Sequence, residues 1–402
     1  MFSHLTAYPG DPILSLNEAF GADARTQKVN LGIGVYLEDD GRVPTMGVVK
    51  AAVEQLKPTN GPFPYLPMEG ARRYRSAVQK LLFTQNNAAL KSECIATVQT
   101  LGGSGALKVA ADFLKTHLSD RKVYVSDPSW DNHRSIFQGA GWEVADYRYF
   151  DPSTGKVDFA GMQEAMWAMA SGSVVILHAC CHNPTGADLN QHQWGALADL
   201  VAERGLLPLV DIAYQGFGAG IHEDAYVLRA LASRDITFLV ANSFSKNFAL
   251  YGERCGALSI VCATATQTEL VLGQLKSTIR KNYSNPPTFG SSLIAEVLES
   301  KQLYTQWAAE LAHMRGRILS MRKQLHALLC DAMQDHDFER LMFQSGMFSY
   351  TGLGVEQVRY LRSMYGVYLV ETGRMCMAAL SAHNVEYVAE AIVSTLKTVP
   401  NS

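Results

Sequence analysis

The sequence contains 402 residues, of which 48% are hydrophobic and 18% are charged, and its formal net charge at pH 7 is -3. This weak negative charge gives no electrostatic reason to expect a nucleic acid or an anionic membrane surface as a partner, so we predict a small-molecule partner instead. The chain is too long for one hydrophobic core, which favours two domains, or one large α/β unit with a smaller companion.

The first twenty residues do not have the pattern of an export signal. They lack a basic start, and Pro9, Asp11 and Pro12 interrupt them before an apolar segment develops. No apolar run approaches the roughly 18 residues of a membrane span. Seven cysteines, an odd number without CxxC spacing, are typical of reduced thiols. We therefore predict a cytoplasmic protein with no membrane partner.

The segment HACCH contains residue types that bind metals, namely His178, Cys180, Cys181 and His182. Adjacent cysteines on a strand point to opposite faces, however, and no second ligand pair follows at the spacing of a zinc finger. We predict no metal site, and we interpret Cys180 and Cys181 as small buried packing residues.

Short apolar runs, each followed by a polar loop and a helix-like segment, recur through the middle of the chain. Four of them read KVYVSDPSW (122–130), SVVILHACCHNPTG (173–186), LLPLVDIAYQGF (206–217) and ITFLVANSFSK (236–246). Nearly continuous apolar runs are typical of buried parallel strands. The helical stretch 189–205 ends at Gly205, a common helix stop. The order of elements predicts an α/β fold with a mostly parallel sheet between helices.

Polar or aromatic residues follow these runs, and they are the first candidates for a site. They are Trp130, Asn183, Asp211, Tyr214, Ser243 and Lys246. Each has an ordinary explanation on its own, such as a turn before Pro184, a helix cap, a core aromatic or a surface lysine. Ligands of open α/β sheets bind beyond the carboxyl ends of the strands. The coincidence of several such residues therefore favours one shared crevice.

A glycine-rich turn at 99–116, QTLGGSGALKVAADFLKT, leads into a helix. The free N–H groups and positive dipole end of such a helix suit a phosphate. The segment lacks both the GxGxxG fingerprint of dinucleotide sites and the GxxxxGK[ST] pattern of a P-loop. Binding of a dinucleotide or a nucleoside triphosphate is therefore not supported.

A phosphate site, a strand-end carboxylate, an aromatic plate and a lysine together indicate pyridoxal phosphate. At this point the sequence resembles class I aminotransferases of the aspartate and aromatic amino acid group. The similar blocks include SFSKNFALYGERCGAL, HNPTGADL, DIAYQGF, SDPSWDNH, IRKNYSNPPTFG and ETGRMCM. Blocks run in the family's order from VNLGIGVY to GRMCMAAL, which covers almost the whole chain. YLPMEG, QTLGGSGALK, ACCHNPTGADL and GMFSYTGL are most similar to bacterial aromatic amino acid (tyrosine) aminotransferases.

The resemblance implies roles for residues around the cofactor. Lys246 matches the lysine that forms a Schiff base with the cofactor aldehyde and then moves the proton between Cα and C4′. Such a lysine needs neighbours that depress its pKa. The residues that match phosphate contacts are Gly103, Ser104, Ser243 and Arg254.

The resemblance also implies which residues contact the cofactor ring. Asp211 matches the carboxylate that keeps the pyridine nitrogen protonated, and His133 matches the residue that orients it. Tyr214 and Asn183 match the pair at the phenolate oxygen. Trp130 matches the aromatic plate stacked on the ring.

Substrate contacts follow from the same resemblance. Arg374 matches the arginine that binds the α-carboxylate, and Gly34 matches the backbone contact that closes over the same group. Trp130 and Asn183 are also expected to contact the substrate. Arg280 matches an arginine from a second subunit that binds a distal carboxylate. Tyr65 matches a tyrosine that crosses to the other subunit's phosphate. The resemblance therefore implies a homodimer with shared sites.

Members of the family have a large domain with a seven-stranded, mainly parallel sheet and a smaller α+β domain formed by both chain ends. We place the N-terminal arm and the first part of the small domain at 1–42, the large cofactor-binding domain at 43–313 and the rest of the small domain at 314–402. The stretch 303–329 resembles the long helix that joins the two domains.

The predicted function is transamination by a ping-pong cycle. The substrates are aromatic amino acids (tyrosine, phenylalanine, tryptophan) and dicarboxylic amino acids (aspartate, glutamate), with 2-oxoglutarate as the acceptor. An aspartate aminotransferase with little aromatic activity is an alternative, because Asn285 in YSNPP resembles the aspartate-preferring pattern.

Two further alternatives come from other classes of protein. A pyridoxal-phosphate lyase or decarboxylase would share Lys246 and Asp211 but would have little use for both Arg280 and Arg374. A regulator built on the same fold would need a nucleic-acid-binding module, and the VNLGIGVY block already begins at residue 29.

Overall fold

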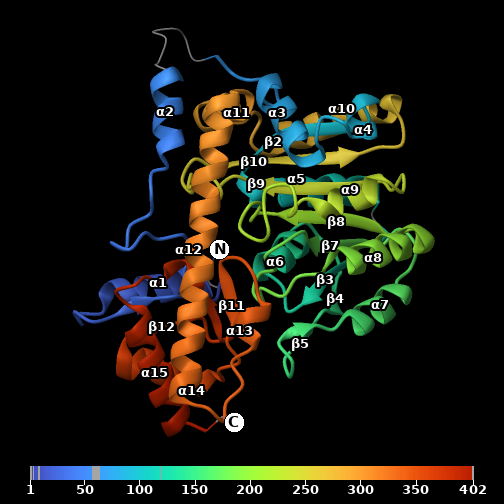
Figure 1. Ribbon diagram of the computed structural model, residues 1–402. Helices are drawn as coiled ribbons and strands as arrows, with labels where there is room; N and C mark the ends of the chain where they lie inside the picture. The colour runs from blue at the N-terminus through green and yellow to red at the C-terminus, as the bar shows by residue number, and fades with distance from the viewer. Residues whose placement is uncertain (1, 3, 8–9, 57–63, 119, 401–402) are drawn as a thin grey trace.

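The computed structural model describes residues 2, 4–7, 10–56, 64–118 and 120–400. Its central feature is a seven-stranded sheet (Figure 1). In spatial order the strands are β2 (Ile95–Leu101), β10 (Cys255–Val261), β9 (Phe238–Ser243), β8 (Leu207–Ile212), β7 (Val174–His178), β3 (Val123–Asp127) and β4 (Val144–Arg148). Only β10 runs antiparallel to its neighbours in this sheet. The sheet is therefore mainly parallel, as predicted.

Side chains from the sheet pack into helices on both faces. Val174 and Ile176 belong to one apolar cluster, whereas Val175 and Leu177 belong to the other, because successive side chains of a strand point to opposite faces. The smaller cluster includes side chains of α5 (Gly102–His117), α6 (Asp131–Gly139) and α10 (Ala265–Asn282). The larger one includes side chains of α2 (Gly47–Leu56), α3 (Arg72–Phe83), α7 (Phe159–Trp167), α8 (Gln191–Arg204), α9 (Tyr226–Ala232) and α11 (Phe289–Glu299).

The four predicted parallel strands are β3, β7, β8 and β9, and they are neighbours in the sheet. His178 pairs with Asp211 across β7 and β8, and Asp211 pairs with Ala241 across β8 and β9. Because these strands are parallel, the residues that follow them emerge at one edge of the sheet. This register brings the candidate residues toward one place.

Both chain ends form the second, smaller part of the molecule (Figure 1). Its strand pairs are β1 (Val29–Asn30) with β12 (Val367–Tyr368), and β11 (Phe348–Tyr350) with β13 (Arg374–Cys376). Its helices are α1 (Pro12–Ala22), α13 (Arg340–Phe343), α14 (Val355–Tyr360) with the π-helical turn Leu361–Tyr365, the 3-10 turn Met377–Ala379, and α15 (Val385–Thr398). The predicted α+β unit built from both ends is confirmed. The boundaries at 42/43 and 313/314 stay predictions.

A single helix, α12 (Lys301–Ala332), runs beside both parts (Figure 1). Near its start, Trp307 Nε1 donates to the backbone oxygen of Asn247 at 2.7 Å. Arg322, near its end, donates to the backbone oxygen of Gly346 in the smaller part at 3.0 Å. The helix thereby connects the segment that carries Lys246 to the smaller part.

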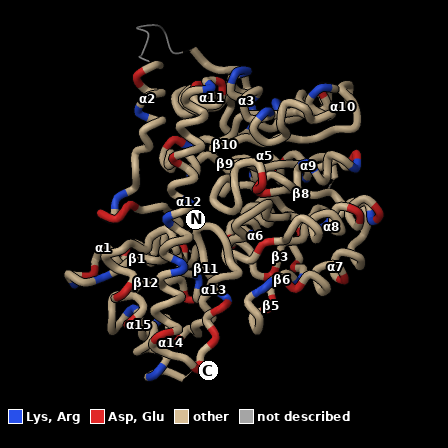
Figure 2. The backbone as a smooth tube through the Cα atoms, in the orientation of Figure 1, with Lys and Arg blue, Asp and Glu red and all other residues tan. Residues whose placement is uncertain are grey.

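Shorter elements complete the described chain: α4 (Ala88–Lys91) and the two-stranded pair β5 (Phe150–Asp151) with β6 (Lys156–Val157). Figure 2 shows basic and acidic residues interspersed along the chain. All seven cysteines lie in the described part and are free of disulfides. Among the described helices, none is both long and apolar enough to cross a membrane.

Candidate active site

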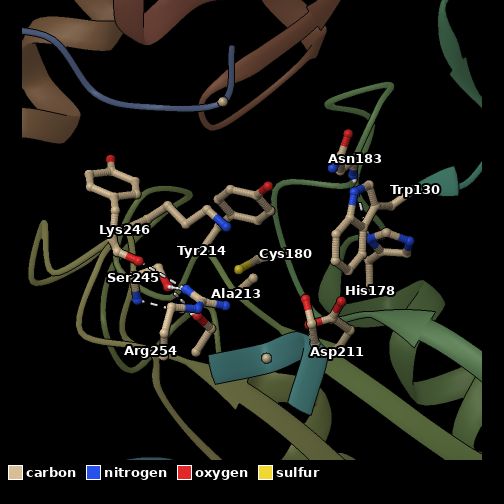
Figure 3. A pocket seen from close by; sticks show the side chains of 15 residues that line it. Trp130, His178, Cys180, Asn183, Asp211, Ala213, Tyr214, Ser245, Lys246 and Arg254 are labelled. Atoms are coloured by element: carbon tan, nitrogen blue, oxygen red, sulfur yellow. Dashed lines mark hydrogen bonds between the residues drawn. The ribbon is translucent and has the colours of Figure 1, made fainter. Parts of the chain in front are cut away.

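The predicted residues meet at a cavity of about 240 Å³ (Figure 3). Those that line it are Gly34, Gly103, Ser104, Trp130, Asn183, Asp211, Tyr214, Ser243, Lys246 and Arg254. They come from the loop after β1, the start of α5, and the segments that end or follow β3, β7, β8 and β9. The structure thus brings together residues that are up to 220 positions apart in the sequence.

Lys246 lies in the loop after β9, beside the ring of Tyr214 (Figure 3). Its Nζ is 5.1 Å from the centre of that ring. The stacking of Phe248 on Trp307, with ring centres 4.8 Å apart, fixes the next turn of the chain. Burial lowers the pKa of Lys246 to about 8, and the charges of Arg254 and Arg374 act in the same direction, against the charge of Asp211. The amine is therefore partly neutral close to physiological pH, whereas an ordinary lysine is almost wholly protonated.

Asp211 presents one bonded and one unbonded carboxylate oxygen. His133 Nε2 donates to Oδ2 at 2.8 Å, and the Ser129 hydroxyl lies 3.0 Å from the other ring nitrogen of His133. Oδ1 is buried and has no hydrogen-bond partner in the described part of the chain. Burial acts to raise the pKa of Asp211, but the hydrogen bond from His133 and nearby positive charges offset it, so the pKa lies below its ordinary value. The carboxylate is ionised and can accept one more donor.

Aromatic rings stand around His133 and fix its position. Trp130 packs edge-on against His133 with ring centres 5.3 Å apart, and His178 does so at 4.9 Å. Burial, together with the nearby His133, lowers the pKa of His178 to about 3, so this ring is neutral. Trp130 therefore presents its indole to the cavity against a rigid support.

The opposite end of the cavity suits an anion. Arg254 donates to the Ser245 hydroxyl at 3.2 Å (Figure 3). The Ser243 hydroxyl lies 3.2 Å from that of Ser245. Gly102 has a φ of +68°, and a Cβ there would lie 2.5 Å from the Arg254 guanidinium. The first turn of α5 also leaves backbone N–H groups without intrahelical partners. This arrangement is typical of a phosphate site.

Arg374 is buried in β13, with 4% of the residue exposed. It donates to the backbone oxygen of Gly32 at 2.7 Å and to the Asn183 side chain at 3.1 Å. Its guanidinium lies 4.4 Å above the centre of the Phe348 ring. Nε has no partner among the described residues. A fixed guanidinium with a spare donor suits a carboxylate.

Four predicted residues do not line this cavity. His133 and Arg374 are buried behind it and bond the lining residues Asp211 and Asn183. Tyr65 and Arg280 lie away from it. Tyr65 is 90% exposed, and Arg280 is exposed at the end of α10, where it donates to the Ser284 hydroxyl. The single chain does not bring them to its own cavity. Their assignment to the site of a second subunit stays a prediction.

Five lining residues were not among the predicted site residues: His178, Cys180, Ala213, Ser245 and Tyr251. Ser245 and Tyr251 flank Lys246 within one sequence block, which could have marked them. His178 and Cys180 stood out only as metal-binding residue types. Ala213 carries no chemical signal.

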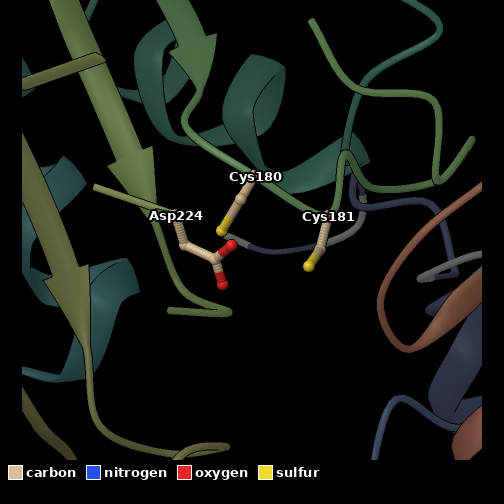
Figure 4. A group of neighbouring side chains, drawn as sticks. All are labelled: Cys180, Cys181 and Asp224. Carbon is tan, nitrogen blue, oxygen red and sulfur yellow. The ribbon is translucent and has the colours of Figure 1, made fainter. Parts of the chain in front are cut away.

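The sulfur atoms of Cys180 and Cys181 and a carboxylate oxygen of Asp224 lie within 4.8 Å of one another (Figure 4). Asp224 already accepts backbone N–H groups from Gly216 and Ala219, both at 2.7 Å, and two longer ones. Hydrogen bonding and burial raise the pKa of Cys180, and burial raises that of Cys181 to about 11, which disfavours the thiolates that bind metals. These contacts account for Asp224 as the organiser of the turn after β8, against which the two cysteines of the loop after β7 pack.

A family model for aminotransferases of class I and II matches residues 26–392. The chain belongs to this family. Curated relatives agree: the aromatic-amino-acid aminotransferase of Escherichia coli K12 is 50% identical over 397 residues, covering 98% of this chain and 100% of that protein. An aspartate aminotransferase of Pseudomonas aeruginosa is 48% identical over 396 residues, with coverage of 98% and 100%. The resemblance stated from the sequence is confirmed, and the protein is an aminotransferase.

Solved structures share the fold over nearly the whole chain. The crystal structure of an aromatic amino acid aminotransferase from Burkholderia cenocepacia superposes with a TM-score of 0.95 at 53% identity and covers 99% of each chain. An aromatic-amino-acid aminotransferase from Burkholderia pseudomallei, described as covalently bound to pyridoxal phosphate, has a TM-score of 0.96 at 48% identity, covering 98% of this chain and 99% of that one.

The lowered pKa of Lys246 predicts how its amine reacts. In the cofactor-free protein, reductive methylation of Lys246 by formaldehyde should rise with pH to a midpoint near 8, because only the neutral amine reacts. An ordinary lysine of pKa about 10.4 would react only about 1/250 as much as its plateau at pH 8. Peptide mass mapping across pH 6–11 measures this, with the exposed Lys281 of the same protein as the internal control. A Lys246 midpoint equal to that of Lys281 would contradict the lowered pKa.

Proposed function

We propose that the protein is a pyridoxal-phosphate-dependent aminotransferase that transfers amino groups between aromatic or dicarboxylic amino acids and 2-oxoglutarate. One observation carries the proposal: the cavity combines a partly deprotonated lysine, an ionised carboxylate with an unbonded oxygen and a cationic end. We further propose that it works in the cytoplasm as a homodimer. The names of the relatives support the substrate class.

The residues present fit pyridoxal phosphate. Asp211 Oδ1 is a buried acceptor to which no described residue donates, and a protonated ring nitrogen would provide that donor. Gly102 leaves no room for a side chain beside Arg254, so the guanidinium can lie against the start of α5, where a phosphate would bind. The similar Burkholderia pseudomallei protein is described as covalently bound to this cofactor.

We assign the contacts as follows. The phosphate would be held by the backbone at Gly103 and Ser104, by Ser243 and by Arg254, and the ring would lie against Trp130. Asn183 and Tyr214 would bond the ring oxygen. Pyridoxal phosphate, when bound, supplies an aldehyde for the amine and a ring that accepts the electron pair left when Cα loses its proton.

Lys246 is the proposed general base and acid. In its neutral form Nζ would take the proton from the substrate Cα, and as an ammonium group it would deliver that proton to the carbon supplied by the cofactor aldehyde. Burial favours the first step because it lowers the pKa of Lys246 to about 8. Asp211 keeps its negative charge throughout, because His133 continues to donate to Oδ2.

Arg374 is the proposed ligand of the substrate α-carboxylate. Its bonds to Gly32 and Asn183 hold the guanidinium in place, and Nε remains available. Gly34 lies at the same end, where a Cβ would come within 2.9 Å of the Phe348 ring. The absence of a side chain therefore lets the backbone approach the substrate.

Arg280 of a second subunit is the proposed ligand of a distal carboxylate, and Tyr65 of that subunit would reach the phosphate. Their exposure in the single chain supports this proposal, because a tyrosine that is 90% exposed has a large apolar surface to bury. An aspartate aminotransferase with little aromatic activity is the second candidate, supported by the Pseudomonas aeruginosa relative.

Replacing Asp211 by Asn tests the proposed ring contact. Asn keeps the size of the side chain but removes the negative charge, so kcat should fall by at least about 1,000-fold, because each pKa unit lost at the ring nitrogen is worth about 1.4 kcal/mol. Steady-state kinetics of the holoenzyme measure the fall, and circular dichroism of the melt checks the fold. A variant that kept most of its kcat would show that Asp211 is only a packing residue.

Replacing Arg280 by Leu separates the two candidate specificities. The half-reaction with aspartate should lose about 100- to 1,000-fold or more in kcat/KM, because removing one partner of a desolvated charge pair costs roughly 3–5 kcal/mol. The kcat/KM for phenylalanine should fall by less than about tenfold, because its ring does not interact with the charge. Single-turnover absorbance changes with each amino acid alone avoid any dependence on the acceptor.

Lys281→Leu is the matched control, because Lys281 is the next residue along α10 and is also exposed. It should leave both half-reactions unchanged. If Arg280→Leu lowered kcat/KM equally for aspartate and for phenylalanine, Arg280 would have a structural role. If the wild type itself showed no reaction with phenylalanine, the second candidate function would replace the first.

A further inference from the structure

The loop that carries Asn183 runs from Ala179 to Leu189, between β7 and α8, and a carboxylate near its end organises it. Asp188 Oδ2 accepts the backbone N–H of Cys181 at 2.7 Å, and Oδ1 accepts that of His182 at 2.8 Å. Cys181 has a φ of +50°, which is unfavourable for a residue other than glycine. The two charge-assisted bonds hold this unfavourable turn immediately before Asn183.

The same carboxylate reaches the smaller part of the molecule. The Ser345 hydroxyl donates to Asp188 Oδ2, and the Ser345 backbone N–H donates to the Gly186 oxygen at 2.7 Å. Ser345 lies just before β11, which contains Phe348. The loop of the large part and the segment entering β11 are therefore joined at Asp188.

The two segments lie too close together for side chains at two glycines. A Cβ on Gly346 would lie 2.4 Å from the Cβ of Cys181, and one on Gly186 would lie 2.7 Å from the backbone oxygen of Phe348. Both glycines also have positive φ values, +74° and +68°. The position of the loop and that of the segment therefore depend on each other.

A buried arginine holds the other side of this segment. Arg322 of α12 is 1% exposed and donates to the backbone oxygens of Gly346 at 3.0 Å and Phe348 at 3.2 Å. It also contacts the Ser349 hydroxyl. Burial lowers the pKa of Arg322 to about 10, and the negative charge of Asp188 opposes this shift. The segment thus lies between a carboxylate on one side and a guanidinium on the other.

Both segments contact Arg374. Asn183, which the loop carries, accepts a hydrogen bond from Arg374 at 3.1 Å. Phe348, which the β11 segment carries, places its ring 4.4 Å below the guanidinium. A relative shift of the loop and the segment would therefore change the direction in which Arg374 points.

We propose that Asp188 is a positioning residue for substrate binding: through its bond to Ser345 it sets the distance between Asn183 and Phe348, and so aims Arg374 at the substrate α-carboxylate. This inference rests on the proposed function of Arg374. It predicts an effect common to all substrates, because every amino acid substrate carries that carboxylate.

The test uses Asp188→Asn and Ser345→Ala in the holoenzyme. An Asn side chain has one acceptor oxygen, so it cannot accept from Cys181, His182 and Ser345 together, and its NH₂ would face an N–H group. Ser345→Ala removes the hydroxyl bond to Asp188 and leaves the backbone bond from Ser345 to Gly186 in place. The readouts are the Kd values of 3-phenylpropionate and succinate, which are carboxylates without an amine, and the saturating rate of the half-reaction with phenylalanine and with aspartate.

Each variant should weaken the binding of 3-phenylpropionate and of succinate equally. The Kd values should rise about tenfold or more in Asp188→Asn and about three- to tenfold in Ser345→Ala. The saturating rates should change by less than about threefold, because Lys246 and Asp211 are untouched. Ser345→Thr keeps a hydroxyl and should restore binding. Asp199→Asn, at a surface carboxylate of α8 that is bonded to Arg234, should change nothing.

Unchanged Kd values in Ser345→Ala would overturn the proposal, even if Asp188→Asn fails to fold. An equal loss of binding and saturating rate, or no restoration by Thr, would also overturn it. A wild type that turns over neither amino acid would instead contradict the proposed function, so the two failures can be told apart.

Discussion

The buried negative charge of Asp211 is the constraint on which the rest of the site depends. A carboxylate with an unbonded oxygen is costly to bury, and His133 stabilises only one of its two oxygens. His133 in turn requires Trp130 and a neutral His178 around it, and the parallel pairing of His178 with Asp211 provides the second of these neighbours. The cavity therefore presents a charge that a cationic ligand group would satisfy.

The protonation state of the Lys246 amine depends on the opposite balance, because here burial disfavours a positive charge. Burial disfavours its ammonium form and Arg254 and Arg374 repel it, whereas Asp211 attracts it. A more exposed lysine would be charged near neutral pH, and one buried without Asp211 nearby would have a still lower pKa. The pKa of about 8 results from these opposing effects, which act from separate parts of the chain. Because α12 fixes the segment after Lys246 through Trp307, the amine cannot easily move out of this environment.

The sequence predicted those parts of the site that depend on local patterns. Apolar runs marked β3, β7, β8 and β9, and the polar residues after them could be expected to meet, because parallel strands share an edge. Arg374 and Gly34 have no such signal, since β13 has three residues and β1 has two, too few for a periodic pattern. Only their resemblance to a family identified them. The antiparallel strand β10 and the contacts of Asp188 could not be predicted either, because they depend on pairing between distant segments.

The site therefore joins two parts of the molecule with different roles, proton transfer in one and carboxylate binding in the other. Lys246 and Asp211 belong to the sheet and its loops, which rigid strands hold in register, whereas Arg374 belongs to the part formed by the chain ends. A misplacement of about 1 Å between the carboxylate ligand and the proton-transfer group can lower a rate by about 100-fold. Correct geometry thus requires direct bonds between the two parts as well as one continuous helix. The bonds of α12 described above reach Asn247 and the segment that enters β11, and not the loop at Asn183. The bond between Arg374 and Asn183 supplies that direct link, and it is short only while the loop and β11 keep their distance.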